Sequence, residues 1–294
     1  MTRRGLLLFV AMCVIWGIPY LLIRVAVRDL SPATLVFART GIGALILLPV
    51  AAAKGQIRPA LRRWAPVFAF ATIEIAVPWL LLSSAEKRLS SSLTGLLVAG
   101  VPLAGALIAR TTGARERLGL TNALGLGLGL GGVAALVGLN VSGAGAGPLA
   151  EVAVVVVCYA IGPVILARYL AGTPALGVIA VSLGLAAIAY APVAAFSLPA
   201  TLPSGRVIAS VLGLAVLCTA LAFLLFFALI EQIGPVRATV ITYVNPAVAA
   251  VLGVGILGES FTLGMGIGFA LVLVGSVLAT RPGRGAEPAP ALAA

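Results

Sequence analysis

The sequence contains no histidine, one aspartate and three cysteines, and each scarcity excludes a class of chemistry. Without imidazole, histidine metal sites and Ser-His catalysis are unavailable. Asp29 cannot form an intramembrane aspartyl dyad by itself, and Cys13, Cys158 and Cys218 form no CxxC pair. The nucleotide-binding pattern G-x-x-x-x-G-K-[ST] is also absent. The sequence therefore predicts no metal, no cofactor and no enzymatic activity.

Charged residues are scarce as well, at 9% of the chain, while hydrophobic residues make up 62% and the mean hydropathy is +1.20. Soluble domains carry about 25% charged residues, so this chain cannot cover its apolar surface in water. A membrane span needs roughly 20 apolar residues, and its backbone must be hydrogen-bonded internally. Long apolar runs without alternation therefore predict an all-α membrane protein.

The apolar runs predict about ten transmembrane helices joined by connectors too short for a soluble catalytic domain. They fall near 5–27, 33–53, 64–84, 90–110, 119–139, 151–170, 174–197, 207–230, 235–257 and 262–280. We expect the first run to be an uncleaved span, because no A-x-A-like cleavage site stands out. The Pro-, Ala- and Gly-rich tail 281–294 is expected to be a disordered cytoplasmic tail.

The net charge of +11 is explained by membrane topology without a nucleic-acid partner. With the N-terminus in the cytoplasm, thirteen basic residues fall on the cytoplasmic side and four outside. The thirteen are Arg3, Arg4, Lys54, Arg58, Arg62, Arg63, Arg110, Arg115, Arg117, Arg168, Arg237, Arg281 and Arg284, and the four are Arg28, Lys87, Arg88 and Arg206. The positive-inside rule predicts cytoplasmic N- and C-termini in the inner membrane, with contact to anionic lipid.

Similar residues recur at a spacing of about 144. The pairs are Arg24 and Arg168, Glu86 and Glu231, Pro102 and Pro246, Glu116 and Glu259, and Gly132 and Gly275. This predicts two five-helix units, 1–140 and 141–280. A unit with an odd number of spans inserts its second copy upside down, and such inverted repeats are typical of secondary transporters.

Two stretches resemble a known family. "CVIWGIPYLLIRVAVRDLSPATLVFART" (13–40), with its Trp-Gly pair, Pro32 and Arg39, resembles the opening of EamA-domain proteins of the drug/metabolite transporter superfamily. "VRATVITYVNPAVAAVLGVGILGESFT" (236–262) resembles the signature of their second half. The resemblance covers essentially the whole chain. It implies ten helices in two EamA repeats, movement of small solutes and no tightly bound cofactor.

Glu74 is the candidate centre of the site. It lies about ten residues into its span, roughly 15 Å deep, and a charge at that depth belongs on a polar interior. Pro78 removes a backbone hydrogen bond nearby and is expected to kink the helix beside a cavity. Burial would favour the neutral acid, which makes Glu74 a proton carrier or a counter-ion for a cationic solute. The alternative is a structural ion pair with Arg39, which lies within about 6 Å of the same depth.

Aromatic and amide side chains extend the predicted solute site. Trp16, Tyr20 and Arg24 share one helical stripe by their spacing, and Tyr159 matches Trp16 in the second half. Tyr243 and Asn245 precede Pro246 inside a span, where they need a neighbouring helix or a solute as partner. For Trp16 and Tyr20 ordinary packing remains the alternative, Arg24 can instead extend toward the outer surface, and Trp79 is expected to serve packing.

The glycine runs at 119–132 and 264–275 contain small-xxx-small spacings, including Gly125 with Gly129 and Gly264 with Gly268. Such spacings let helices approach closely. We therefore expect these glycines to serve helix packing. Such packing would suit either a monomer or a homodimer.

Together these patterns predict a secondary transporter that moves a small organic solute, such as a metabolite, amino acid or drug, by alternating access with proton coupling through Glu74. One alternative is an uncoupled facilitator in which Glu74 pairs with Arg39. Others are a non-transporting membrane scaffold and a Glu-dependent membrane enzyme.

Overall fold

The computed structural model describes residues 2–111, 120–140, 145–234, 238 and 240–280. The described residues are helical, with no strand among them. Some predictions lie outside these ranges: those for Glu116, Arg115, Arg117, Arg237, Arg281, Arg284 and the tail 281–294, and the side chain of Arg110.

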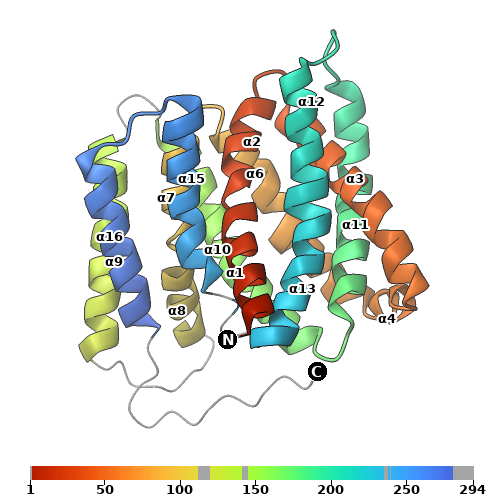
Figure 1. The fold of residues 1–294 in the computed structure, drawn as a ribbon, viewed down its shortest axis with the longest axis horizontal. Helices are drawn as coiled ribbons and strands as arrows, with labels where there is room; N and C mark the ends of the chain where they lie inside the picture. The colour runs from red at the N-terminus through yellow and green to blue at the C-terminus, as the bar shows by residue number, and fades with distance from the viewer. Residues whose placement is uncertain (1, 112–119, 141–144, 235–237, 239, 281–294) are drawn as a thin grey trace.

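The helices follow one another as an up-and-down bundle (Figure 1). In chain order they are α1 Arg3–Ile15, α2 Ile18–Ala26, α3 Pro32–Ala53, α4 Ile57–Arg62, α5 Trp64–Phe70, η1 Ala71–Ala76, α6 Val77–Ala85, α7 Ser91–Val98, α8 Val101–Thr111, α9 Leu120–Asn140, α10 Ala146–Tyr169, α11 Ala175–Phe196, α12 Gly205–Leu212, η2 Gly213–Leu221, α13 Ala222–Ile233, α15 Ile241–Leu257 and α16 Leu263–Ala279. The segments η1 and η2 are π-helical.

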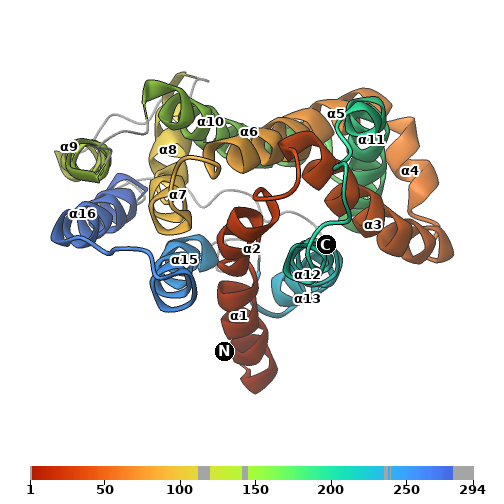
Figure 2. The same cartoon turned by 90° about the horizontal axis from the view of Figure 1, so that it is seen from above.

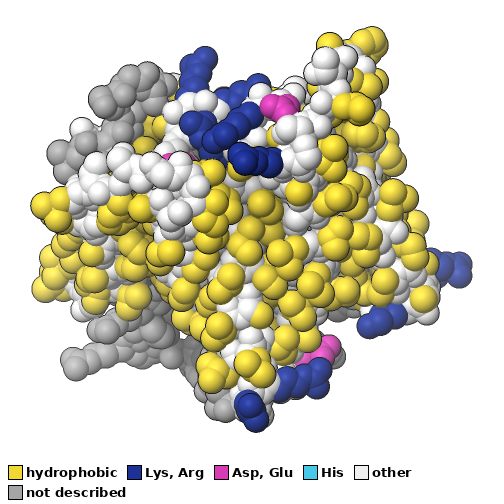
Figure 3. Space-filling view, turned by 45° about the horizontal axis from the view of Figure 1, so that its top comes forward, with side chains coloured by type: hydrophobic (Ala, Val, Ile, Leu, Met, Phe, Trp, Pro, Cys, Tyr) yellow, Lys and Arg dark blue, Asp and Glu magenta, His cyan; other side chains and the backbone are white. Residues whose placement is uncertain are grey.

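Eight helical stretches among the described residues are long and apolar enough to cross a membrane, and α15 and α16 are shorter apolar helices of 17 residues each. These ten stretches coincide with the ten predicted spans to within a few residues. The sides of the bundle are largely hydrophobic, and Lys and Arg gather toward its two ends (Figure 3). This distribution suits a protein whose flanks contact lipid.

Local sequence fixes where several helices begin and end. Ser31 and Ser90 accept hydrogen bonds from Thr34 N and Leu93 N, which caps α3 and α7. At the other end of a helix, Gly258 adopts a left-handed conformation (φ 67°) after α15, a conformation that glycine adopts at little cost. The first span is interrupted between α1 and α2 at Trp16 and Gly17.

Helices that are far apart in the sequence pack together in pairs. α9 packs on α16, α3 on α11, and α7 on α15 (Figure 2). α1 and α2 contact α13 and α12, while α6 contacts α10. The core is therefore built from contacts between the N-terminal and C-terminal parts of the chain.

Glycines allow the closest of these contacts. A methyl group on Gly132 of α9 would come within 2.7 Å of Gly268 O and Val272 N of α16. One on Gly275 would come within 2.6 Å of Gly125 O. The predicted role of the glycine runs in packing is thus confirmed for these residues, and the face is used inside the monomer.

The bundle has two distinct ends. α1 begins and α16 ends at the lower end in Figure 1. Arg3, Arg4, Lys54, Arg58, Arg62, Arg63 and Arg168 lie at this end, and Arg28, Lys87, Arg88 and Arg206 lie at the opposite end. The described residues that were predicted on the cytoplasmic side thus lie at one end, and those that were predicted outside lie at the other. Which end faces the cytoplasm stays a prediction.

Candidate functional site

Arg39 of α3 is the most deeply buried arginine in the described ranges, with 7% of its surface exposed. Its guanidinium carbon lies 3.5 Å from the centre of the Trp79 ring, a cation–π contact. Its Nε donates a hydrogen bond of 2.9 Å to Oγ1 of Thr219 in η2. Thr219 Oγ1 in turn donates to Leu214 O at 2.8 Å. A cation in the bundle interior is thus held by helices from both parts of the chain.

Two predicted tyrosines lie around this cation. Tyr20 of α2 is buried, and Tyr159 of α10 is partly buried and packs against the two core clusters that contain Tyr20 and Trp79. With Arg39 and Trp79, the two tyrosines bring one residue each from α2, α3, α6 and α10 into one region, which is the candidate site.

Glu74 lies in the π-helical segment η1, against α10. A methyl group on Gly162 would overlap its Oε2 and lie 2.8 Å from its Cδ, so the carboxylate rests directly on the glycine. Oε2 is buried and has no hydrogen-bond partner. An unpaired carboxylate oxygen in this setting is costly when charged.

The ion pair considered between Glu74 and Arg39 is not found. Within the described ranges Arg39 binds Trp79 and Thr219, and no ion pair joins its guanidinium to the Glu74 carboxylate. Arg39 contacts α6 and η2, whereas Glu74 contacts α10.

Pro78 is buried near the start of α6, directly after η1. Before Pro78 the helix is π-helical, and Val77 N donates to Thr72 O five residues earlier. The expected kink stays a prediction. Because η1 continues directly into α6, Pro78 lies inside one continuous span, and its missing N–H leaves the preceding turn without one backbone hydrogen bond. The nearby carbonyl of Ala76 accepts a hydrogen bond of 3.0 Å from Tyr190 Oη.

The expected stripe of Trp16, Tyr20 and Arg24 is not continuous, because the helix is interrupted at Gly17. Trp16 packs on Phe223 and Phe226, with ring centres 5.9 and 4.7 Å apart. Arg24 donates to the carbonyl oxygen of Glu86. Trp16 therefore joins an aromatic cluster on α13, separate from Tyr20.

Tyr243 and Asn245 are also set apart from Arg39. Tyr243 Oη lies 3.5 Å from Thr280 Oγ1, at the end of α16. With its amide oriented so that both atoms are satisfied, Asn245 Nδ2 donates to Cys13 O at 2.9 Å and Ile241 O at 3.0 Å. Asn245 thus joins α15 to α1 by a hydrogen bond, so its partner is a neighbouring helix, one of the two partners expected from the sequence.

Sequence reasoning missed three residues of the site: Trp79, Thr219 and Gly162. Trp79 was expected to serve packing, yet it is the platform for Arg39. Gly162 is recognisable only once α10 is known to contact Glu74. One signal for Thr219 was its position next to Cys218, which the repeat aligns with Glu74.

A second polar cluster lies at the upper end. The carboxylate of Glu259 accepts hydrogen bonds from Ser91 N (2.8 Å), Ser92 N (2.9 Å) and both serine hydroxyls, which caps α7 from α15. Glu86 is fully buried, and neither carboxylate oxygen has a partner. Burial and the repulsion from Glu259 raise the pKa of Glu86 well above its ordinary value, against the opposing effect of Arg24.

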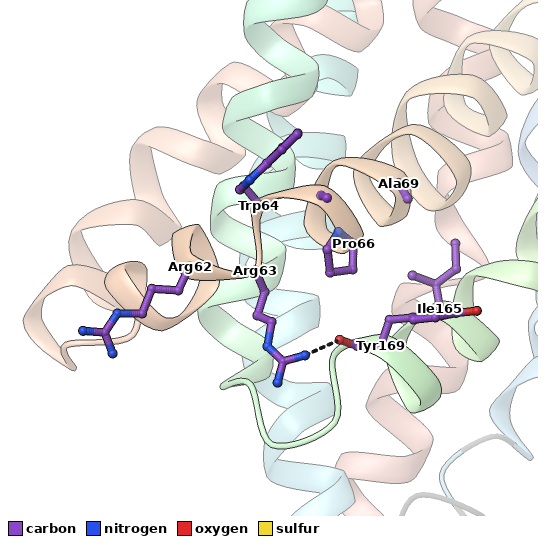
Figure 4. Close-up of a pocket in the computed structure, with 8 residues that line it drawn as sticks. Arg62, Arg63, Trp64, Pro66, Ala69, Ile165 and Tyr169 are labelled. Atoms are coloured by element: carbon purple, nitrogen blue, oxygen red, sulfur yellow. Dashed lines mark hydrogen bonds between the residues drawn. The ribbon is translucent and has the colours of Figure 1, made fainter.

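Hollows at the lower end complete the description. One of about 510 Å³ lies between α5 and α10 (Figure 4), and one of about 280 Å³ lies beside α4. Neither is lined by Glu74 or Arg39. In the part of the chain that the structure describes, no group of three His, Cys, Asp or Glu side chains could hold a metal ion.

A bundle of long apolar helices with a buried cation at its centre defines a polytopic membrane protein, and comparison with known proteins gives its class. The model of the EamA-like transporter family matches the chain twice, at residues 3–138 and 149–281. The chain therefore belongs to the EamA-like transporter family, within the drug/metabolite transporter superfamily, as its motifs predict. It is a multi-pass protein of the cytoplasmic membrane.

Among its relatives are proteins named "Uncharacterized inner membrane transporter YedA" from Escherichia coli strains K12 and O157:H7. Each is 29% identical over 275 residues, which cover 90% of this chain and 88% of the relative. A solved structure described as "Crystal structure of protein" superposes with a TM-score of 0.68 at 22% identity, covering 95% of this chain and 98% of the other. That likeness shows a shared fold.

Proposed function

We propose that the protein moves a small organic solute across the cytoplasmic membrane by alternating access between two inverted five-helix units, 1–140 and 141–280. The two family matches divide the chain at nearly the same point. The packing is similar in the two units. The first span of unit 1–140 (α1 and α2) contacts α12 and α13 of the other unit, and the first span of unit 141–280 (α10) contacts η1 and α6. The first helices, α1 and α10, run in opposite directions. Two such units give outward- and inward-open states of similar energy.

The observation that carries the proposal is the placement of Arg39. A buried guanidinium stacked on Trp79 and held by Thr219 from the other unit has no carboxylate partner in the described ranges. Leaving such a charge unpaired is costly, so a solute that brings an anionic group would gain by binding there. Tyr20 and Tyr159 flank the site and suit a flat or apolar body on that solute.

Proton coupling is assigned to Glu74. Its carboxylate rests on Gly162 of the other unit, and its buried Oε2 has no hydrogen-bond partner, so a charge there is costly. Movement of the units would expose the carboxylate to water and release the proton. The alternative is an uncoupled facilitator in which neutral Glu74 serves only packing against Gly162.

The test uses the purified protein in proteoliposomes that contain a pH-sensitive dye. A panel of amino acids, nucleosides and cationic drugs is added outside, and proton movement and solute uptake are both recorded. We expect a solute with an anionic group to evoke proton flux in the wild type. Glu74→Gln should lose that flux yet still exchange labelled solute, while the exposed Glu231→Gln should behave as wild type.

Unchanged proton flux in Glu74→Gln would rule out the coupling role. Solute uptake without proton flux in the wild type would identify the facilitator. Turnover of a compound in detergent, with no vectorial uptake in vesicles, would instead indicate a membrane enzyme, and no response of either kind would favour a scaffold. Labelling of introduced cysteines near Arg3 and Ala279 would test the expected cytoplasmic location of both ends.

A further inference from the structure

The hollow of about 510 Å³ between α5 and α10 has no role in the transport scheme (Figure 4). Its mouth is formed by Arg62, Arg63, Trp64 and Tyr169. Its apolar wall includes Ala69 and Ile165. The hollow thus combines exposed charged and aromatic side chains with less exposed apolar ones.

The groove lies at the level where two membrane spans end. Trp64 begins the span Trp64–Ala85, and Tyr169 ends the span Ala146–Tyr169. The two rings are 70% and 58% exposed. Exposed tryptophan and tyrosine at span ends are typical of the layer of lipid headgroups. The mouth of the groove therefore faces headgroups, and its wall faces acyl chains.

The mouth carries positive charge without compensation. Arg62 and Arg63 are both exposed, and no acidic residue is among those that line the hollow. Arg63 Nη1 donates to the backbone carbonyl oxygen of Tyr169 at 3.4 Å, which directs this side chain across the groove (Figure 4). Arg63 keeps further guanidinium donors that can bind a phosphate with planar, bidentate geometry. The exposed Arg62 points away from Arg63 in Figure 4 and adds positive charge beside the groove.

The apolar wall offers no favourable contact to a small water-soluble anion. Ala69 and Ile165 offer no hydrogen-bonding side chain, and the neighbouring Phe68 is 57% exposed. A ligand that fits the whole groove has an anionic head and a hydrocarbon tail. Ala69 precedes Glu74 by five residues and Ile165 follows Gly162 by three, so about one helical turn separates the wall from the Glu74 contact.

We propose that this groove binds an anionic phospholipid, with its phosphate at Arg63, in the positive field of Arg62, and an acyl chain along Ala69 and Ile165. Basic pockets between membrane helices on the cytoplasmic side bind such headgroups. The site requires neither proton coupling nor a particular solute, so it can fail or hold independently of the proposed function.

The test is quenching of tryptophan fluorescence in lipid nanodiscs by brominated phosphatidylglycerol or brominated phosphatidylcholine at equal mole fraction. The chain has three tryptophans, and the part of the signal lost in Trp64→Phe belongs to Trp64. We expect phosphatidylglycerol to be preferred at Trp64 by about tenfold. The double variant Arg62→Gln/Arg63→Gln should lose the preference.

The matched control is Arg3→Gln/Arg4→Gln, an exposed arginine pair at the same end, which should keep the preference. If the Arg62/Arg63 variant melts early in phosphatidylcholine, Ala69→Leu replaces it, because it narrows the wall without changing charge and should also weaken the preference. Equal quenching by both lipids overturns the proposal. So does a preference that the Arg3/Arg4 variant loses equally, or one that millimolar inorganic phosphate removes.

Discussion

Replacing either of two neighbouring glycines of α9, Gly131 and Gly132, by alanine should change the stability of the protein in opposite directions. Gly132 faces α16, where a Cβ atom would lie 2.7 Å from the backbone atoms Gly268 O and Val272 N. Gly131 faces away, and nothing lies within 4 Å of the position that a methyl group would take there. We therefore predict that Gly132→Ala destabilises the protein and that Gly131→Ala does not.

The magnitude follows from the contacts. At Gly132 the methyl would lie 0.7 Å inside the 3.4 Å at which ordinary contact begins, and both obstacles are backbone atoms that cannot rotate away. Overpacking of this kind costs about 1–3 kcal/mol. At Gly131 alanine is favoured in a helix by about 0.8–1.0 kcal/mol. The same gain applies at Gly132 and cancels between the two variants, which should therefore differ by about 1–3 kcal/mol.

The measurement is thermal unfolding of each variant in the same detergent, followed by size-exclusion chromatography to detect dissociation or aggregation. We expect the melting temperature of Gly132→Ala to fall clearly below that of the wild type, with Gly131→Ala at or above it. Equal melting temperatures, or a lower one for Gly131→Ala, would refute the close packing of α9 on α16.

Other changes test the two polar clusters. Gly162→Ala should displace the Glu74 carboxylate and reduce proton flux as Glu74→Gln does, and flux equal to wild type would contradict the contact. Arg39→Lys keeps the charge but loses the planar fork that can hold an anionic group, and a hydrogen bond to a charged group is worth about 1.5–3 kcal/mol. Affinity for an anionic solute should therefore fall at least about tenfold; unchanged affinity in binding measurements would remove Arg39 from the site. Because the folded-state pKa of Glu86 is raised, the folded protein binds its proton more tightly than the unfolded chain. Stability should therefore fall as pH rises above the ordinary glutamate pKa toward the raised value. Glu86→Gln should flatten this slope in melting curves between about pH 5 and about pH 8, and parallel slopes would refute it.

Composition was enough to predict that the chain lies in a membrane and forms helices. The length of each apolar run is read directly from the sequence, and caps such as Ser31 and Ser90 mark where helices begin. The family motifs in 13–40 and 236–262 predicted a membership that the family model confirms. These features depend on local sequence, which is why they could be predicted.

The site was less predictable because its contacts join distant positions. Arg39 and Thr219 are 180 residues apart, and the one protein partner that the sequence suggested for Arg39, as an alternative, was the carboxylate of Glu74. The stripe through Trp16 and Tyr20 assumed an unbroken helix, which Gly17 interrupts. The position of Glu74 within its span made it a candidate, which stays a prediction, and its neighbour Gly162 could be found only from packing.

The π-helical segments give both long spans an adjustable register. A π turn holds one more residue between hydrogen-bonded partners than an α turn. If that surplus residue passes along the helix, each position it crosses rotates by about 100° about the axis. In η1 the rotated residue would be Glu74, and in η2 it would be Thr219, the partner of Arg39. A local twist would thus give Glu74 a new neighbour and would separate Thr219 from Arg39, while the ends of each span stay fixed at the membrane surfaces.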